Sequence, residues 1–248
     1  MQSLSRILWC ITGAGGQLRN VFEAFLRFRK KHPSVEIGIA LSKAGEEVSR
    51  IYGVLDRLGE VASRSRYGGI YRNASWSGIT PDGIPLGGRI SLHRYDVVAI
   101  APASSDTVAK IAYGISDTLP TMAANQALKT QIPLIVLPAD FAMRFATLPC
   151  LINEYKCKCC LFCVDECPYG AIHILPNRDV RIDYNKCRGC GACRESCEYG
   201  AIQCWEKVRI YPSPIDLKNV AELRRVDGIH VVKDSEELVG KLKGLLKL

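Results

Sequence analysis

Eight cysteines in two regularly spaced runs are the residues of this chain best suited to chemistry. Each run has the spacing C-x2-C-x2-C-x3-C, and the members are Cys157, Cys160, Cys163, Cys167, Cys187, Cys190, Cys193 and Cys197. Three closely spaced thiolates can hold three corners of a cubane iron–sulfur cluster, while the fourth cysteine of such a run reaches a second cluster. The spacing therefore predicts two 4Fe-4S clusters and electron transfer.

Each predicted cluster takes three ligands from one run and one from the other. One set is Cys157, Cys160, Cys163 and Cys197, and the other is Cys187, Cys190, Cys193 and Cys167. The flanks repeat too, as Cys-Pro-Tyr-Gly-Ala-Ile at 167–172 and Cys-Glu-Tyr-Gly-Ala-Ile at 197–202. This duplication resembles the bacterial two-cluster ferredoxins and implies a small α+β domain. Glu198 stands where that family has proline, and Cys159 has the wrong offset for a ligand.

Disulfides and zinc are the alternative uses of cysteine. Disulfide frameworks are typical of small secreted domains, and we find no secretory segment in the chain. Zinc sites pair C-x2-C units, whereas four cysteines are chained twice here. Iron–sulfur binding is therefore the expectation. The cysteines outside the runs, Cys10, Cys150 and Cys204, are expected to be buried small apolar residues.

The residues before the cysteine runs predict a parallel α/β sheet. An apolar run at 7–12 breaks into Gly13-Ala14-Gly15-Gly16, and apolar residues then recur at helical spacing from Leu18 to Leu26. Further strands are expected at 35–41, 96–101 and 134–137, and further helices at 46–58, 108–113 and 121–128. Alternating strands and helices favour a Rossmann-like parallel sheet. Residues 59–88 lack periodicity and predict a long functional loop.

The residues after the cysteine runs return to the α/β pattern. They predict a helix at 215–223, a strand at 228–232 and an amphipathic helix at 235–246. We therefore expect one domain over 1–149 and 207–248, interrupted by an inserted two-cluster domain at 150–206.

Two turns at strand ends are suited to bind an anion. Gly13 and Gly15 give G-x-G, although Leu18 replaces the third glycine of the dinucleotide fingerprint. The second turn, Ser104-Ser105-Asp106-Thr107, opens the helix after strand 96–101. Helix N-termini favour phosphate, and the carboxyl ends of neighbouring parallel strands meet at one crevice.

Four segments resemble the homo-oligomeric flavin-containing cysteine decarboxylase superfamily. They are residues 11–16, 40–43, 101–117 and 133–139, and the likeness covers most of 7–139. The resemblance implies a Rossmann-like flavoprotein domain that binds FMN, commonly at a subunit interface in trimers or multiples of trimers. Carried over position by position, the implied FMN residues are Gly13, Ala14, Gly15, Ser42, Ala103, Ser104, Ser105 and Thr107.

Three positions depart from that family. Arg89 occupies the place nearest to the catalytic histidine of the decarboxylase branch, and Pro138 is not followed by the Pro-x-Met-Asn substrate clamp. Asp106 stands where asparagine is usual. Cysteine decarboxylation is therefore not expected, and no side chain is assigned as an acid–base catalyst.

The combination of this flavin family with a two-cluster insert resembles the archaeal iron–sulfur flavoproteins of the acceptor-type dihydromethanopterin reductase group. That resemblance implies an oxidoreductase in which ferredoxin or another low-potential donor supplies electrons through two 4Fe-4S clusters and FMN to a pterin. Dihydromethanopterin would become tetrahydromethanopterin, and the aromatic segment from Tyr67 to Trp76 is a candidate lid. The alternative is a relay between ferredoxin and a partner protein without a small substrate.

The formal charge of +8 does not by itself indicate nucleic-acid binding. Two clusters with their thiolates bring about −4 and a flavin phosphate about −2, which leaves roughly +2. No apolar run approaches the length of a membrane span. We therefore expect a cytoplasmic homo-oligomer that binds neither nucleic acid nor membrane.

Overall fold

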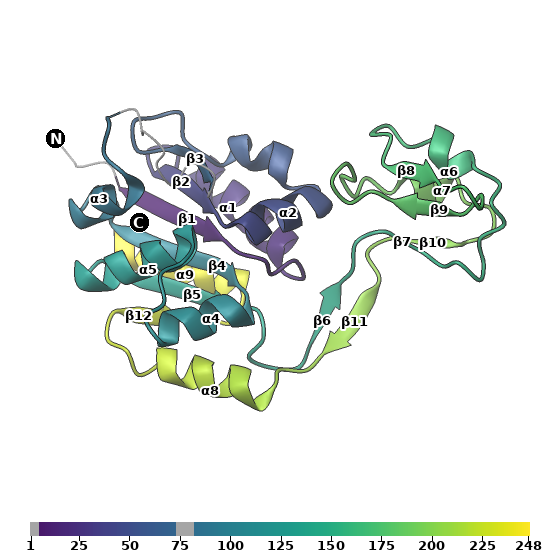
Figure 1. Ribbon diagram of the computed structural model, residues 1–248. Helices are drawn as coiled ribbons and strands as arrows, with labels where there is room; N and C mark the ends of the chain where they lie inside the picture. The colour runs from purple at the N-terminus through teal and green to yellow at the C-terminus, as the bar shows by residue number, and fades with distance from the viewer. Residues whose placement is uncertain (1–4, 73–81) are drawn as a thin grey trace.

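A six-stranded parallel sheet forms the centre of the larger part of the molecule. The computed structural model describes residues 5–72 and 82–248. The strand order is β12-β5-β4-β1-β2-β3, and every neighbouring pair is parallel (Figure 1). The strands are β1 (Arg6–Ile11), β2 (Glu36–Leu41), β3 (Gly69–Arg72), β4 (Val97–Ala103), β5 (Leu134–Pro138) and β12 (Ile229–Val231). The predicted Rossmann-like sheet is confirmed.

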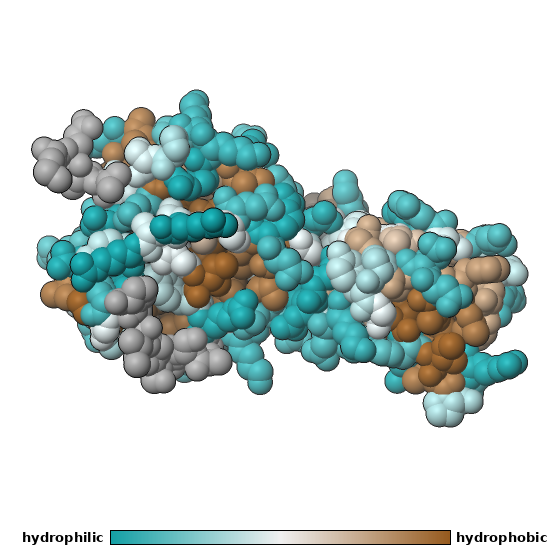
Figure 2. All heavy atoms as spheres, turned by 90° about the horizontal axis from the view of Figure 1, so that it is seen from above, coloured by the Kyte–Doolittle hydropathy of each residue, from teal (hydrophilic) through white to brown (hydrophobic). Residues whose placement is uncertain are grey.

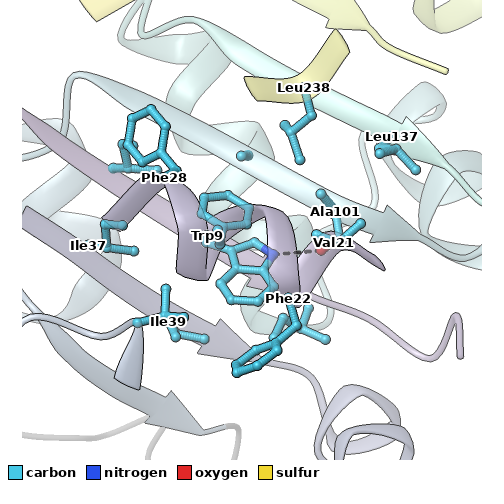
Figure 3. Close-up of a cluster of buried hydrophobic side chains, with 14 of the residues drawn as sticks. Trp9, Val21, Phe22, Phe28, Ile37, Ile39, Ala101, Leu137 and Leu238 are labelled. Atoms are coloured by element: carbon cyan, nitrogen blue, oxygen red, sulfur yellow. Dashed lines mark hydrogen bonds between the residues drawn. The ribbon is translucent and has the colours of Figure 1, made fainter. Parts of the chain in front are cut away.

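Helices cover both faces of this sheet and bury two separate cores. One core holds alternate β1 residues under α1 (Leu18–Lys31) and α9 (Ser235–Leu246), and Figure 3 shows its centre. The other core lies under α3 (Leu86–Ser91), α4 (Ser105–Ala112), α5 (Leu119–Lys129) and α8 (Pro214–Leu223). Strand side chains alternate between faces, so strands apolar at every position are buried on both sides.

Trp9 and Thr12 hold the ends of β1 and β4 together. The fully buried Trp9 stacks on Phe25 with ring centroids 4.3 Å apart. Its Nε1 donates to the Ala101 carbonyl at 2.6 Å (Figure 3). The Thr12 hydroxyl donates to the Pro102 carbonyl at 2.8 Å and accepts from the Ser104 amide at 2.8 Å. These bonds satisfy polar groups that burial would otherwise penalise, and they fix the two strand-end turns relative to each other.

The segment 43–91 differs from the sequence expectation in two places. The helix expected at 46–58 is α2 (Lys43–Ile51) followed by a separate 3-10 helix, η1 (Leu55–Glu60), because Gly53 turns the chain with φ +68°. The segment 59–88 is not one loop, since it contains the edge strand β3 and the start of α3. Trp76, part of the proposed lid, lies outside the described residues.

Arg89 is a buried structural cation. Its side chain is fully buried, and its Nε and Nη2 donate to one carboxylate oxygen of Asp82 at 3.1 and 2.7 Å. Its Nη1 donates to the Tyr71 hydroxyl at 2.7 Å. Arg89 therefore joins α3 to the edge strand.

The cysteine-containing segment is inserted between β5 and β12 and extends on a two-stranded arm (Figure 1). The arm pairs β6 (Arg144–Thr147) with β11 (Lys207–Ile210) antiparallel. Beyond it lie β7 (Leu151–Ile152) with β10 (Ile202–Gln203), β8 (Ile172–Ile174) with β9 (Val180–Ile182), and the short helices α6 (Phe162–Asp165) and α7 (Ala192–Glu195). The predicted insertion of a small α+β unit is confirmed.

The unit beyond the arm, which contains β7 to β10 with α6 and α7 and is called the small unit below, exposes apolar surface. Figure 2 shows apolar residues on its outside, and Phe162 and Ile174 are 55 % and 49 % exposed. None of the helices within residues 5–72 and 82–248 is both long and apolar enough to cross a membrane.

Candidate functional site

A cavity of about 230 Å³ lies at the carboxyl ends of the central strands. It gathers the glycine turn after β1, the start of α4, the segment after β5 and the two strands of the arm. Its lining residues are Gly13, Ala14, Gly15, Gly16, Gln17, Ser104, Ala139, Asp140, Arg144, Ala146 and Ile210. The structure thus brings together four of the eight residues that the resemblance assigns to FMN.

The glycines of this turn leave no room for side chains. A Cβ at Gly15 would lie 2.4 Å from the Tyr52 ring, and a Cβ at Gly16 would lie 2.8 Å from the Ala146 Cβ. Gly15 and Gly16 can therefore pack against Tyr52 and the arm only because they have no side chain. This close packing leaves main chain at the base of the cavity, directly before the N-terminus of α1.

Arg144 brings a partly unsatisfied guanidinium to the cavity. Its Nη2 donates to the Pro138 carbonyl at 3.0 Å, whereas its Nη1 is buried and has no hydrogen-bond partner among the described residues. Burial lowers the pKa of Arg144, and the nearby charge of Asp140 acts in the opposite direction. The Gln17 Oε1 is also buried and has no partner in the part of the chain that the structure describes.

A phosphate-bearing cofactor fits this arrangement. An unsatisfied buried donor costs free energy, and a phosphate oxygen would supply the acceptor that Arg144 Nη1 lacks. The helix N-terminus adds a favourable dipole for the same anion. A flavin mononucleotide supplies such a phosphate, so the cavity residues fit the implied cofactor.

Two of the serines expected at the flavin, Ser42 and Ser104, are helix N-caps. Ser42 accepts from the Gly45 amide at 2.9 Å, and Ser104 accepts from the Thr107 amide at 3.3 Å. Ser105 donates to the Asp140 carboxylate at 2.7 Å. Four expected FMN residues are not among the described residues that line this cavity: Ser42, Ala103, Ser105 and Thr107. Asp106 is bonded to Lys110 within α4 at 3.0 Å.

The eight run cysteines converge on two cavities in the small unit. One is lined by Cys157, Cys160, Cys163 and Cys197 with Cys159 beside them, and the other by Cys167, Cys187, Cys190 and Cys193 with Cys150 beside them. Each cavity therefore gathers three cysteines of one run and the last cysteine of the other.

Left-handed residues at matching places in the two runs make this convergence possible. The second and fourth residues after the first cysteine have positive φ in both runs: Cys159 and Leu161 in the first, Gly189 and Gly191 in the second. Backbone amides point at the sulfurs, as Ala171 does at Cys167 Sγ and Ala201 at Cys197 Sγ, each at 3.3 Å. Cys159 thus occupies a turn position at which the second run has glycine.

The thiols in each cavity are close together, so their ionised forms need a nearby positive charge. Burial, with added repulsion from neighbouring thiols, raises the pKa of Cys163 to about 11 and that of Cys193 to about 11. Thiolates are the ligands of iron, and a metal core would favour their ionised form. Both cavities therefore fit iron–sulfur clusters.

The family model described as Flavoprotein matches residues 1–147, which is more than half of the chain. The chain belongs to this flavoprotein family. A second model, a 4Fe-4S binding domain, matches residues 180–203 of the flavoprotein, and this match supports at least one 4Fe-4S site at the second cysteine run.

Relatives of the flavoprotein bear the name that the resemblance implied. It is 38 % identical to a dihydromethanopterin reductase (acceptor) of Methanocaldococcus jannaschii, over 94 % of this chain and 94 % of the relative. It is 35 % identical to a protein of the same name in Methanosarcina mazei, over 96 % and 98 %. The solved structure of Burkholderia xenovorans DmrB in complex with FMN, described as a cubic protein cage for redox transfer, has 27 % identity, full coverage of both chains and a TM-score of 0.62. The recognised resemblance is confirmed.

Two aromatic rings connect the small unit of the flavoprotein to its glycine turn. The Trp205 ring lies 5.5 Å from the Tyr52 ring between centroids, and a Cβ at Gly189 would lie 2.6 Å from Trp205. The Tyr52 ring in turn fills the space at Gly15. Since the Gly189 amide donates to Cys187 Sγ at 3.4 Å, a packed path runs from a second-run cysteine to the glycine turn.

A salt bridge fixes the same contact. The Arg188 Nε donates to the Asp56 carboxylate of η1 at 2.8 Å, and the Tyr52 hydroxyl donates to the Thr147 carbonyl at 2.7 Å. The small unit of the flavoprotein therefore packs against α2 and η1 in addition to being connected through the arm.

Cys150 and Cys204 are buried as expected, but the expectation that they are separate apolar side chains is wrong, because they form a disulfide. The ladder of β7 and β10 pairs Leu151 with Gln203 and Ile152 with Ile202, so the next opposed pair is Cys150 and Cys204. They are 54 residues apart in the chain, and only the ladder register of the folded unit reveals their pairing.

Arg144 and Gln17 are site residues that sequence reasoning missed in the flavoprotein. Gln17 directly follows the glycine turn and could have been included with it. Arg144 lies on the arm, far along the chain from that turn, so no local spacing signals its position.

Proposed function

We propose that this flavoprotein is an oxidoreductase that takes electrons from ferredoxin or another low-potential donor and reduces dihydromethanopterin to tetrahydromethanopterin. The observation that carries the proposal is the packed contact through Trp205 and Tyr52 between the second cysteine run and the glycine turn. The two dihydromethanopterin reductases, similar along nearly the whole chain, support the substrate class.

FMN is the proposed cofactor of the glycine-turn cavity. Gly13, Ala14, Gly15 and Ser104 would surround it, and Arg144 Nη1 would donate to its phosphate. The FMN in the DmrB relative supports this assignment. We keep Ser42, Ala103, Ser105 and Thr107 as proposed contacts, since carboxyl-end turns of neighbouring strands lie along one crevice.

Two 4Fe-4S clusters are proposed for the unit at 150–206. One would be held by Cys157, Cys160, Cys163 and Cys197, and the other by Cys187, Cys190, Cys193 and Cys167. When bound, the clusters supply single electrons and the flavin supplies the two-electron step that an organic substrate requires. The Trp205 and Tyr52 rings would exclude water between the two kinds of site.

A homo-oligomer built from trimers is the proposed assembly. The cage described for the DmrB relative supports an assembly of identical chains. The apolar surface of the small unit, including the exposed Phe162, would be the docking face for a donor protein.

The test is an anaerobic turnover measurement. The protein, with iron and FMN contents established, is reduced with low-potential ferredoxin and mixed with dihydromethanopterin, and the pterin is followed by absorbance and mass spectrometry. We expect stoichiometric tetrahydromethanopterin. Reduced protein that leaves the pterin unchanged but rapidly reduces an added protein acceptor would instead establish the relay function.

A further inference from the structure

The Cys150–Cys204 disulfide closes the neck of the small unit. The chain enters the unit beside Cys150 and leaves it beside Cys204, where the arm meets the ladder of β7 and β10. The two residues are 1 % and 5 % exposed. A neighbouring hydrogen bond, from the Tyr184 hydroxyl to the Cys150 carbonyl at 2.8 Å, holds this neck against the body of the unit.

The disulfide also touches the second cysteine cavity. Cys150 lines the cavity in which Cys167, Cys187, Cys190 and Cys193 converge. The sulfur atoms of Cys150, Cys193 and Cys204 all lie within 4.8 Å of one another. A proposed cluster ligand is therefore almost in van der Waals contact with a disulfide that no ligand run includes.

Burial closes the usual route to this disulfide. Thiol–disulfide exchange requires a thiolate from solution to reach one of the sulfurs, and its rate depends on that access. With both cysteines buried, dissolved thiols have little access. A cluster held by the cysteines of the adjoining cavity would not face this barrier, because Cys150 lines the same cavity inside the protein.

We propose that Cys150 and Cys204 are a redox-active pair that exchanges electrons with the cluster held by Cys187, Cys190, Cys193 and Cys167. Two one-electron steps from a low-potential one-electron donor, delivered through that cluster, break the S–S bond. Two protons from water complete the two thiols. The pair then stores two electrons beside a one-electron centre. This inference rests on the proposed second cluster.

The experiment uses the cluster-loaded, full-length protein under anaerobic conditions, after its iron content has been measured. Reduced methyl viologen is the one-electron donor, and samples are acid-quenched, alkylated and digested with trypsin. The peptide 145–156 contains Cys150 as its single cysteine, so its state reports the pair directly. We expect it to be linked to peptide 195–207 before reduction and alkylated after reduction.

Electron counting gives an independent readout. Full reduction of the wild-type protein is expected to consume about two more electrons per chain than reduction of Cys150→Ser/Cys204→Ser, because a disulfide is a two-electron couple. Cys10→Ala, which removes a buried cysteine of β1, is the control and keeps the wild-type count. Dithiothreitol alone, for the same time, should leave the wild-type pair linked.

The outcomes separate the two proposals. Iron content that excludes a second cluster overturns both the cluster assignment and this inference. Clusters that are present and reduced while peptide 145–156 stays linked overturn the inference alone, as does a pair already present as thiols in the oxidised protein. If the double serine variant fails to fold, the peptide map of the wild-type protein still decides.

Discussion

At the scale of single residues, Arg144 combines a buried donor that has no partner among the described residues with a place in the glycine-turn cavity. A buried guanidinium nitrogen without an acceptor is unfavourable, and the cavity that it lines has a backbone base and a helix N-terminus suited to an anion. Arg144→Gln keeps much of the volume but removes the charge. Hydrogen bonds to charged groups contribute about 1.5–3 kcal/mol, so FMN affinity should fall about 10- to 100-fold. Quenching of flavin fluorescence during titration of the deflavinated protein measures this change.

Arg209→Gln is the matched control for that variant. Arg209 lies on the partner strand of the same arm, with its guanidinium 5.6 Å from the centre of the Phe145 ring, and it is not among the described residues of the cavity. Its replacement should change FMN affinity less than about twofold, since exposed cations contribute little. An unchanged affinity in Arg144→Gln would remove Arg144 from the phosphate site.

At the scale of elements, the two cysteine runs act as one interlocked unit. Helices α6 and α7 contact each other, and the last cysteine of each run lies in the cavity of the other run. Replacing two cysteines of the same cavity by alanine should therefore have a different effect from replacing one cysteine in each cavity. Cys160→Ala/Cys197→Ala should leave about four irons per chain, because the other ligand set stays complete.

Cys160→Ala/Cys167→Ala is the comparison, because it shortens both ligand sets by one cysteine. We expect it to retain less than about four irons per chain, with both cluster signals altered in electron paramagnetic resonance spectra. Iron analysis of the two variants side by side decides which cysteines hold the same cluster. If Cys160→Ala/Cys167→Ala kept one intact cluster and Cys160→Ala/Cys197→Ala kept none, each run would hold its own cluster.

The elements that sequence could predict are those with a local signal. The buried strands correspond to apolar runs in the sequence, and α1 and α9 have apolar residues at helical spacing. β3 escaped prediction because a short edge strand that starts at Gly69 has neither a long apolar run nor a clear alternation. The Cys150–Cys204 pair and the place of Arg144 depend on contacts between distant segments, and no local pattern contains that information.

At the scale of the whole molecule, the insertion holds the small unit in a fixed position against the larger domain. A unit on a flexible linker would sample many distances from the glycine turn. Here the two arm strands and the contact with α2 and η1 hold the unit at one distance from that turn. The formal charge of +8 belongs to the chain before any cofactor, and the proposed clusters and phosphate would offset most of it. Fixed placement and internal neutralisation both suit a molecule organised around bound anionic cofactors.

Trp205 makes several of the contacts that hold the small unit against the larger domain. Its ring meets Tyr52, Gly189 and the Arg19 guanidinium, which lies 4.4 Å from the ring centre. Trp205→Ala should cost about 2 kcal/mol or more of burial at the contact, so local opening should become at least about tenfold more frequent. Hydrogen exchange should accelerate at the amides of Tyr52 and Gly53, and electron arrival at the flavin, followed by stopped-flow absorbance, should slow.

Tyr155→Ala tests whether these changes come from the contact with the larger domain or from the loss of any aromatic ring. Tyr155 belongs to the same small unit but is 98 % exposed, so its removal should alter neither exchange nor rate. Iron and FMN contents should stay at wild-type values in both variants, because neither residue lines a cofactor cavity among the described residues. Faster exchange in Trp205→Ala without a slower flavin signal would mean that electrons reach the flavin by another path, such as a neighbouring chain of the proposed oligomer. The same rate in a dilute, monomeric sample would then exclude that neighbour.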